Sequence, residues 1–149
     1  MFEGRRLTPM IDVLTTEQRH HCMARIKGKD TKPELYIRSM VHRMGYRFRL
    51  HRKDLPGKPD IVLGGLKKVI FVHGCFWHNH ACRHCRVKPQ TNPHFWQTKR
   101  QSNADRDRRN VRALRKAGWQ VLVVWECWIK DPLNLERRIG QFLTKSQFR

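Results

Sequence analysis

Three cysteines and a histidine have the types and spacing of ligands for a zinc ion. Cys75, His80 and Cys82 lie within one short segment, and Cys127 lies far along the chain. Thiolate and imidazole are ligands that zinc prefers, and four protein ligands complete its tetrahedral coordination. We therefore expect a structural zinc site that ties two distant segments together. Cys82-x-x-Cys85 is also a metal-binding spacing, so a four-thiolate site with Cys85 in place of His80 is an open alternative.

A stiff turn, Leu55-Pro-Gly-Lys-Pro59, leads to an aspartate at the start of a predicted strand. Proline fixes φ and glycine permits the reversal, so the carboxylate of Asp60 is held on a rigid backbone. In phosphodiester-cleaving sites, Mg²⁺ is bound through one or two protein oxygens, with water and phosphate as the other ligands. Asp60 is therefore a candidate magnesium ligand, although an aspartate here is more often a simple turn residue.

Two histidines, His73 and His78, lie in the same segment as the predicted zinc ligands. An ordinary imidazole has a pKa near ~6.5, so it can accept a proton from water or assist a departing oxygen near neutral pH. Hydrolysis of a phosphodiester needs both tasks. We therefore treat His73 and His78 as candidate acid-base residues, and assign no such role to His42, His51 or His94.

Two large aromatic residues, Phe76 and Trp77, stand between these histidines. In a generic protein they would pack beneath the metal site. Beside a basic catalytic cleft, aromatic side chains can instead insert between base pairs and unstack them, which costs less where pairing is already imperfect. The sequence alone leaves both roles open.

The elements that must position these residues begin with two predicted helices. Thr15 with Gln18 fits the S/T-x-x-E/Q capping box at a helix start. Thr31 with Glu34 fits the same box, and the apolar stripe that follows ends at Gly45.

Apolar patterns predict four strands. Residues 46–50 alternate between apolar and basic side chains, which is typical of a half-buried strand. Residues 60–63, 69–72 and 121–125 are short β-branched runs, which are typical of buried central strands.

Two further helices are predicted in the second half of the chain. Asn92 and Pro93 can cap and open a crossover helix that runs to Ala117, with Gly118 as its stop. Apolar residues at helical spacing mark a last helix over 135–143. The order helix, helix, three strands, helix, strand, helix predicts an α/β fold, a mixed β-sheet with helices on both faces.

The chain of 149 residues, 39% hydrophobic, suffices for one packed domain. We predict a loosely structured N-terminal tail over residues 1–14 and a single domain over 15–149. No apolar run approaches the ~20 residues of a membrane span, and the first residues lack a signal core, so we expect a cytoplasmic protein without membrane contact. The five cysteines are an odd number, which argues against a disulfide framework.

The charge balance indicates a polyanionic partner. Lys and Arg number 32 against 12 Asp and Glu, giving a formal charge of +20 that is spread along the whole chain. Taken alone, this balance favours a nucleic-acid-binding protein without catalysis over any enzyme.

Four motifs together resemble one known family. They are Pro-Gly-Lys-Pro-Asp at 56–60, Val-His-Gly-Cys-Phe-Trp-His-x-His at 72–80, Asn-Ala-Asp-Arg-Asp-Arg-Arg at 103–109, and the stretch from Gly118-Trp to Trp-Glu-Cys127. In their order and spacing they are similar to the very short patch repair endonucleases. The resemblance implies a restriction-endonuclease-like fold, a structural zinc, and catalytic magnesium used to nick DNA beside T·G mismatches that arise from deaminated 5-methylcytosine.

The resemblance also implies the metal ligands. Asp60 corresponds to the family's metal-binding aspartate, and the main-chain carbonyl of Val72 to a second magnesium ligand. Related nucleases often have an acid at this second position and a lysine soon after it, so in this chain more of the chemistry falls to the histidines. The implied zinc ligands are Cys75, His80, Cys82 and Cys127, which favours His80 over Cys85.

The remaining implied roles concern proton transfer and DNA contact. His78, oriented by Asp107, resembles the water-activating base, and His73, near Glu34, resembles the group that assists the leaving oxygen; which imidazole has which role stays open. Phe76 and Trp77 correspond to residues that enter the duplex, and Met23 to one that enters it from the opposite side.

The implied substrate is double-stranded DNA with a T·G mismatch, nicked by a monomer on the 5′ side of the T, and relatives use a mismatch-repair ATPase as partner. The implied location is the bacterial cytoplasm, at the nucleoid. Two alternatives are a zinc-stabilised binding module without catalysis and a restriction-type endonuclease that cuts both strands.

Overall fold

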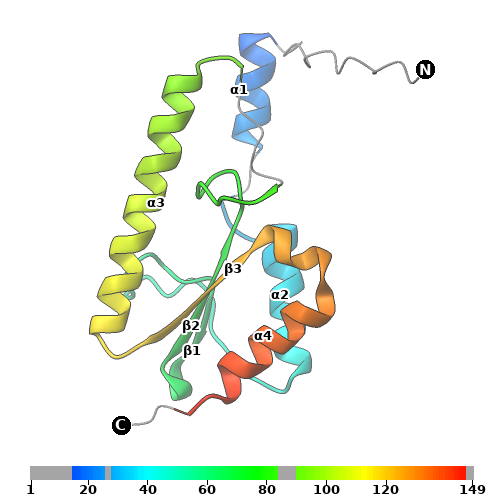
Figure 1. The fold of residues 1–149 in the computed structure, drawn as a ribbon, viewed down its shortest axis with the longest axis vertical. Helices are drawn as coiled ribbons and strands as arrows, with labels where there is room; N and C mark the ends of the chain where they lie inside the picture. The colour runs from blue at the N-terminus through cyan, green and yellow to red at the C-terminus, as the bar shows by residue number, and fades with distance from the viewer. Residues whose placement is uncertain (1–14, 26–27, 84–89, 147–149) are drawn as a thin grey trace, which may run out of the picture.

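A small mixed sheet forms the centre of the molecule, as the computed structural model of residues 15–25, 28–83 and 90–146 shows (Figure 1). Its strands are β1 (Ile61–Leu63), β2 (Lys68–His73) and β3 (Gln120–Trp125), in the order β1-β2-β3. β1 runs antiparallel to β2, whereas β3 runs parallel to β2 and pairs with it along its whole length. The carboxyl ends of β2 and β3 therefore lie side by side.

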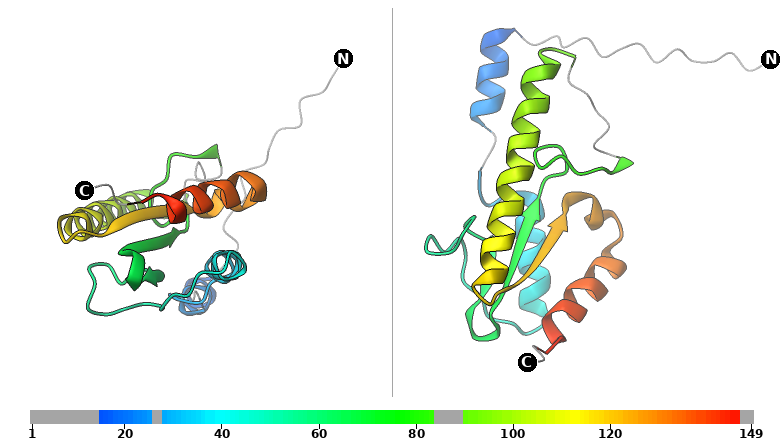
Figure 2. Two further views of the ribbon diagram at one scale, coloured as in Figure 1. Left: turned by 90° about the horizontal axis from the view of Figure 1, so that it is seen from below. Right: turned by 60° about the vertical axis from the view of Figure 1, so that its left-hand side comes forward.

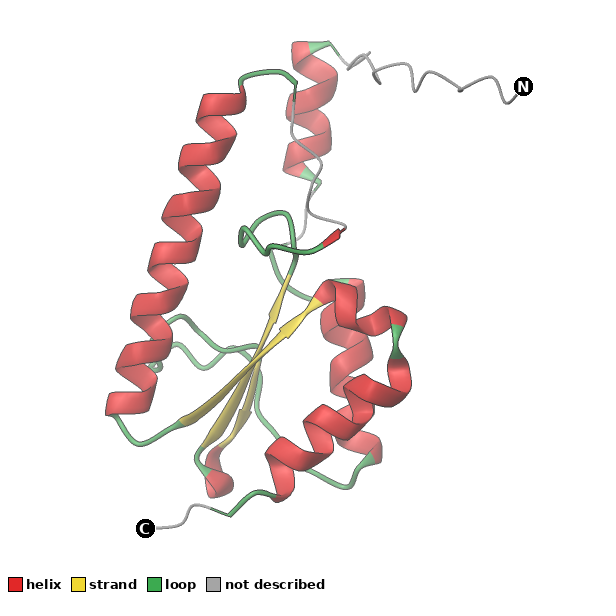
Figure 3. Ribbon diagram, in the orientation of Figure 1, coloured by secondary structure: helices red, strands yellow, loops and turns green. Residues whose placement is uncertain are grey.

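The described part of the chain contains four α-helices, of which the last three lie beside the sheet and the first lies apart from it, beyond the carboxyl end of β2 (Figure 3). They are α1 (Thr16–Ala24), α2 (Lys32–Arg43), α3 (Pro93–Lys116) and α4 (Pro132–Thr144). A short 3₁₀ helix, η1 (Gly64–Leu66), follows β1, and another, η3 (Glu126–Lys130), follows β3. None of the described helices is long and apolar enough to cross a membrane.

Both predicted helix starts are confirmed, and the capping box of Thr15 and Gln18 is reciprocal, as predicted. The main-chain N–H of Gln18 donates to Thr15 Oγ1 at 3.2 Å, and that of Thr15 donates to Gln18 Oε1 at 2.9 Å. Thr31 caps α2 by accepting from the N–H of Glu34 at 3.4 Å, and the Glu34 carboxylate accepts in turn from the N–H of Asp30 at 2.8 Å. Glu34 is thereby fixed at the first turn of α2.

Apolar residues divide into two cores, one on each face of the sheet. Ile37, Met40 and Val41 of α2 and the buried face of α4 pack on one face, against alternate residues of the strands. Leu114 of α3 packs on the other face, against Val62, Val69 and Phe71. Figures 1 and 2 show α2 and α3 on opposite sides of the strands. The predicted mixed sheet with helices on both faces is confirmed.

Buried Lys68 ties the end of α4 to the sheet. Its Nζ donates to the main-chain carbonyls of Phe142, Leu143 and Lys145 at 2.7, 2.8 and 2.7 Å. Carbonyls at the end of a helix lack partners within the helix and carry its negative dipole end, so an ammonium group there is stabilising. Burial lowers the pKa of Lys68, and these three acceptors compensate for its loss of water.

Three local predictions need correction. Residues 46–50 are not a strand of the sheet but form one isolated antiparallel bridge, Arg49 with Val62, because β1 is only three residues long. Asn92 precedes α3 with φ of 57°, and its side chain makes no capping hydrogen bond. β3 is mostly half-buried, whereas its β-branched run predicted a fully buried strand, because it lies at one edge of the sheet.

Candidate active site

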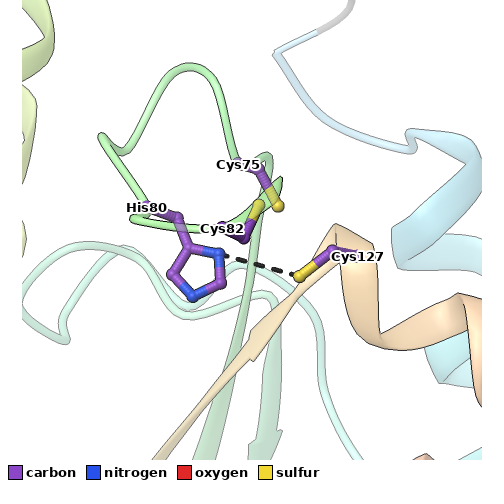
Figure 4. Close-up of side chains that lie close together, drawn as sticks. All are labelled: Cys75, His80, Cys82 and Cys127. Atoms are coloured by element: carbon purple, nitrogen blue, oxygen red, sulfur yellow. Dashed lines mark hydrogen bonds between the residues drawn. The ribbon is translucent and has the colours of Figure 1, made fainter. Parts of the chain in front are cut away.

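The four predicted zinc ligands come together at the carboxyl ends of β2 and β3 (Figure 4). Cys75 follows β2 and Cys127 lies in η3 directly after β3, so the parallel pairing of the strands brings them together. His80 and Cys82 return to the same point from the loop after β2. One ligand atom from each side chain lies within 4.8 Å of all the others. We call Cys75, His80, Cys82 and Cys127 the thiol cluster.

The geometry of the thiol cluster fits a tetrahedral metal ion. Cys127 Sγ and His80 Nδ1 are 3.7 Å apart. In a zinc site with Zn–S near 2.3 Å and Zn–N near 2.0–2.1 Å, tetrahedral angles place adjacent sulfur and nitrogen ligands about 3.6 Å apart. The cluster can therefore hold a metal ion without moving its ligands far. Cys85 lies outside the described residues.

The electrostatics of the thiol cluster also favour a cation. Burial raises the pKa of Cys127, and the neighbouring thiols of Cys75 and Cys82 raise it further, because several thiolates in one small volume repel one another. Burial lowers the pKa of His80, which keeps its imidazole neutral and able to bind a metal. A bound cation would remove the repulsion between the thiolates.

A second group, His73, His78 and Asp107, lies on the α3 side of the same strand end, and we call it the histidine pair with its aspartate. The rings of His73 and His78 are stacked, with centroids 3.8 Å apart and planes 4° from parallel. Nδ1 of His78 is hydrogen-bonded to a carboxylate oxygen of Asp107, which α3 carries. The sequence prediction that Asp107 orients His78 agrees with this contact.

Electrostatics distinguish the two imidazoles. Burial lowers the pKa of His73 to about 4, and the adjacent His78 contributes to this, so His73 is neutral at neutral pH. Burial alone would raise the pKa of Asp107, but its hydrogen bond with His78 and the nearby imidazole charges outweigh this and lower it. An ionised Asp107 holds the proton of His78 on Nδ1 and leaves Nε2 to accept another. His73 has no such carboxylate among its described hydrogen bonds.

Asp60 directly precedes β1, beside the end of β2. Its Oδ2 accepts a hydrogen bond from the main-chain N–H of Val72 at 2.6 Å. Gly57 in the preceding turn has φ of +74°, and a Cβ there would lie 2.8 Å from the Asn110 side chain on α3, so only glycine suits this turn. The predicted turn before a strand is confirmed.

Burial makes the negative charge of Asp60 unfavourable in the absence of a cation. It raises the pKa of this carboxyl to about 6, and the charge of nearby Glu34 acts in the same direction. A hard oxygen ligand in these surroundings fits a magnesium ion, which would stabilise the ionised form. Among the described residues, the side chains whose ligand atoms cluster as for a metal are the thiol cluster, the histidine pair with its aspartate, and the group Asp30, Glu34 and His51. Asp60 is in none of these groups, so the magnesium site stays a prediction.

Glu34 lies beside His51 rather than in contact with His73. Its Oε2 is 3.0 Å from Arg38 Nη2 and 3.8 Å from His51 Nε2. On its other side, His51 Nδ1 is 3.8 Å from Asp60 Oδ1. His51, to which the sequence analysis assigned no role, therefore lies between two predicted site residues. The strand register would have revealed this position, because an antiparallel pairing of Arg49 with Val62 places His51 opposite Asp60.

The predicted wedge residues, Phe76 and Trp77, are half-buried in an aromatic cluster. Their ring centroids are 5.2 Å apart, and Trp96 of α3 lies 5.8 Å from Phe76 and 5.7 Å from Trp77. The exposed ring of Phe95 continues the cluster. Met23 lies in α1, and its side chain is outside the description.

One face of α3 holds the loop that carries the wedge. Arg100 Nε donates to the carbonyl of Phe76 at 2.8 Å, and Asn103 Nδ2 donates to that of Trp77 at 3.0 Å. With Trp96 and Asp107 these residues have helical spacing and contact successive residues of the loop. Sequence reasoning missed Trp96 and Arg100, although the spacing of 96, 100, 103 and 107 was visible as one helix face.

The fold is similar to that of a known nuclease. The catalytic domain of the homing endonuclease I-Bth0305I matches 76% of this chain and 94% of its own, with a TM-score of 0.53 at 20% sequence identity. At this identity the similarity concerns the fold alone, and it defines the class as an α/β domain with a mixed sheet.

Sequence comparison gives the family. The model of the DNA mismatch endonuclease Vsr family matches residues 11–84. DNA mismatch endonuclease Vsr of Escherichia coli K12 is 41% identical, over 85% of this chain and 80% of that protein. The type II nicking enzyme V.XorIIP of Xanthomonas oryzae pv. oryzae is 47% identical, over 92% of this chain and 100% of that protein. The chain belongs to the Vsr family of DNA mismatch endonucleases and is a DNA endonuclease, as the sequence motifs predicted.

Proposed function

We propose that this endonuclease nicks the T-containing strand of a T·G mismatch on the 5′ side of the T, with Mg²⁺ at Asp60 and a structural Zn²⁺ in the thiol cluster. The observation that carries the proposal is the convergence at the end of β2. There the Asp60 carboxylate is bonded to Val72, and the next residue, His73, stacks on the Asp107-bound His78. A hard-cation ligand and an oriented base thus contact adjacent residues of one strand, Val72 and His73.

The role of each side chain follows from its surroundings. A magnesium ion bound at Asp60, with the Val72 carbonyl as a second ligand, would polarise the scissile phosphate. His78 accepts a proton from water at Nε2, because Asp107 holds the other proton on Nδ1. His73 is neutral and more buried, which suits a group that packs against His78 and assists the leaving oxygen by hydrogen bonding.

The aromatic cluster suits mismatch recognition. Phe76 and Trp77 keep part of their surface exposed, and hydrogen bonds from α3 fix the carbonyls of both residues. A rigid loop loses little conformational freedom when its rings enter a base step. A wobble pair stacks less well than a Watson–Crick pair, so insertion there costs less. Met23 would enter from the opposite side, and one copy of the chain is sufficient for one nick.

Labelled duplexes with and without a T·G pair test the proposal in the presence of Mg²⁺. We expect a single nick 5′ of the T in the mismatched duplex, no cleavage of the matched duplex, and no product without a divalent cation. Cutting of both strands at an intact site would instead support a restriction-type endonuclease. Binding without cleavage would support a binding module.

Trp77→Ala tests the wedge. If stacking of a base on a ring contributes ~1–3 kcal/mol, the variant should lose on the order of tenfold or more in the single-turnover rate on T·G DNA. Salt-dependent binding to matched DNA should change little, because it depends on phosphate contacts. Trp119→Ala, at the opposite end of β3, is the matched control. An unchanged mismatch preference in a zinc-replete Trp77→Ala variant would rule out the wedge, although not the nicking activity.

A further inference from the structure

His51 lies in a chain of contacts that begins at a buried arginine and ends at the proposed magnesium ligand. The guanidinium of Arg38 is mostly buried, with its side chain 11% exposed. Its Nη1 donates to Asp30 Oδ1 at 2.7 Å, and its Nη2 donates to Glu34 Oε2 at 3.0 Å. The same Nη2 lies 2.9 Å from His51 Nε2. Arg38 is therefore fixed by two carboxylates while its remaining Nη2 hydrogen faces the imidazole.

This contact determines where the proton of His51 lies. A guanidinium can only donate hydrogen bonds, so Nε2 of His51 must be the acceptor and must lack a proton. A neutral imidazole then carries its proton on Nδ1. That nitrogen faces Asp60 Oδ1 at 3.8 Å. The separation exceeds a direct hydrogen bond, and a movement of about 1 Å would close it.

We propose that His51 is a positioning residue of the nuclease site, held by Arg38 as the Nδ1–H tautomer so that it orients the Asp60 carboxylate for the cation. The inference rests on the proposed magnesium site. With Val72 N–H on Oδ2 and His51 Nδ1–H facing Oδ1, both oxygens of Asp60 have a directed donor from the protein. Groups that orient a metal-binding carboxylate in this way commonly contribute 10–100-fold to metal affinity or activity.

The tautomer can be observed without magnesium or DNA. Long-range ¹H–¹⁵N spectra of the zinc-containing protein at pH 7.5 should show an unprotonated Nε2 and a protonated Nδ1 for His51, assigned by comparison with His51→Gln. In Arg38→Met, where the donor is removed and the side-chain length is kept, the preference should weaken. A protonated Nε2 in the wild type would overturn the proposal.

Magnesium affinity is the second readout, measured by calorimetry and by the half-saturating Mg²⁺ concentration for nicking. His51→Ala should weaken Mg²⁺ binding by about 10-fold or more, with zinc content and Tm unchanged. His51→Gln should stay within about threefold of wild type, because an amide can both accept from Arg38 and donate to Asp60. His42→Ala, an exposed histidine on α2, is the control.

The outcomes separate positioning from other roles. If His51→Ala binds Mg²⁺ like wild type, or if His51→Gln is as weak as His51→Ala, the proposal is wrong. A wild-type protein that fails to nick T·G DNA, yet shows this pattern of Mg²⁺ affinities, would refute the proposed function and leave the role of His51 intact.

Discussion

The thiol cluster and the histidine pair lie at the same edge of the sheet but are built differently. In the thiol cluster the side chains face one another, and burial together with the neighbouring thiols raises the pKa of Cys127. In the histidine pair, and at Asp60 nearby, side chains meet fixed partners from neighbouring elements: Asp107 of α3 and the main chain of β2. Four side chains that can fill all positions around a metal suit a structural site. Side chains that are oriented by other groups and keep a free position suit a catalytic site. Loss of a thiol-cluster ligand should therefore lower the stability of the fold, whereas loss of the Asp60 charge should raise it.

The largest effect is expected from Cys127→Ser. Binding energy at a closed metal site is folding energy, of order 10–16 kcal/mol for structural zinc, which is comparable with the whole stability of a small domain. We expect loss of bound zinc and of cooperative unfolding together, measured by metal analysis and thermal denaturation. Cys22→Ser, at a cysteine that the sequence does not predict as a zinc ligand, is the control. A soluble, active wild type that contains no zinc would contradict the assignment.

Asp60→Asn should abolish nicking and leave the fold intact. The change removes one charged metal ligand but keeps a side-chain oxygen that can accept from Val72, so DNA binding, which depends on many cationic contacts, should change little. We expect the single-turnover rate to fall by about 10³-fold or more while the DNA Kd is nearly unchanged. Asp54→Asn, an exposed aspartate in the same loop, should behave like wild type. Nicking by Asp60→Asn at the wild-type rate would exclude Asp60 as a ligand.

The smallest expected effect is a pH-dependent gain in stability from the same substitution. Because the folded-state pKa of Asp60 is raised to about 6, the folded protein binds more protons than the unfolded one between about pH 4 and 6, and stability falls as pH rises through this range. Without magnesium, Asp60→Asn should therefore be more stable than wild type by about 3 kcal/mol at pH 7.5.

Denaturant unfolding at several pH values measures this difference, which should disappear near pH 4. His73 has the opposite effect on the pH dependence of stability. Because its folded-state pKa is lowered, the stability that it contributes is lost as pH falls below about 6.5. That slope is common to both proteins and cancels in the comparison. A variant less stable than wild type at pH 7.5 would show that burial of the Asp60 charge costs little.

Short sequence patterns, each within one helix, strand or turn, predicted most of the fold. Caps, turn residues and β-branched runs located the helices and the three strands of the sheet. The predicted crossover helix lies between 69–72 and 121–125, which the structure shows to be paired in parallel. The strand predicted over 46–50 was wrong, because alternation reports which side chains face the core and not whether a partner strand is long enough. Tyr46 and Phe48 do pack against the core, as the alternation indicated.

The candidate site was predicted where one segment or a family motif supplied it, and missed where contacts cross between elements. The grouping of the zinc ligands and the contact of His78 with Asp107 agree with the structure. The position of His51 between Glu34 and Asp60 depends on how α2 packs against the sheet, which no local pattern contains. A correct strand register would have pointed to His51, and the helical spacing on α3 would have pointed to Trp96 and Arg100.

The parallel pairing of β2 with β3 also means that the site is completed late during synthesis of the chain. The ribosome makes Asp60, both histidines of the pair and three members of the thiol cluster first, then the whole of α3, and only afterwards β3 and Cys127. A strand pairing of this kind must await its distant partner. The last position of the thiol cluster is therefore filled only after β3 has emerged and aligned with β2. Trp125, whose indole stacks on His80 and meets the edge of His73, arrives at the same moment. A nascent chain that still lacks β3 thus carries the proposed catalytic residues without their final support.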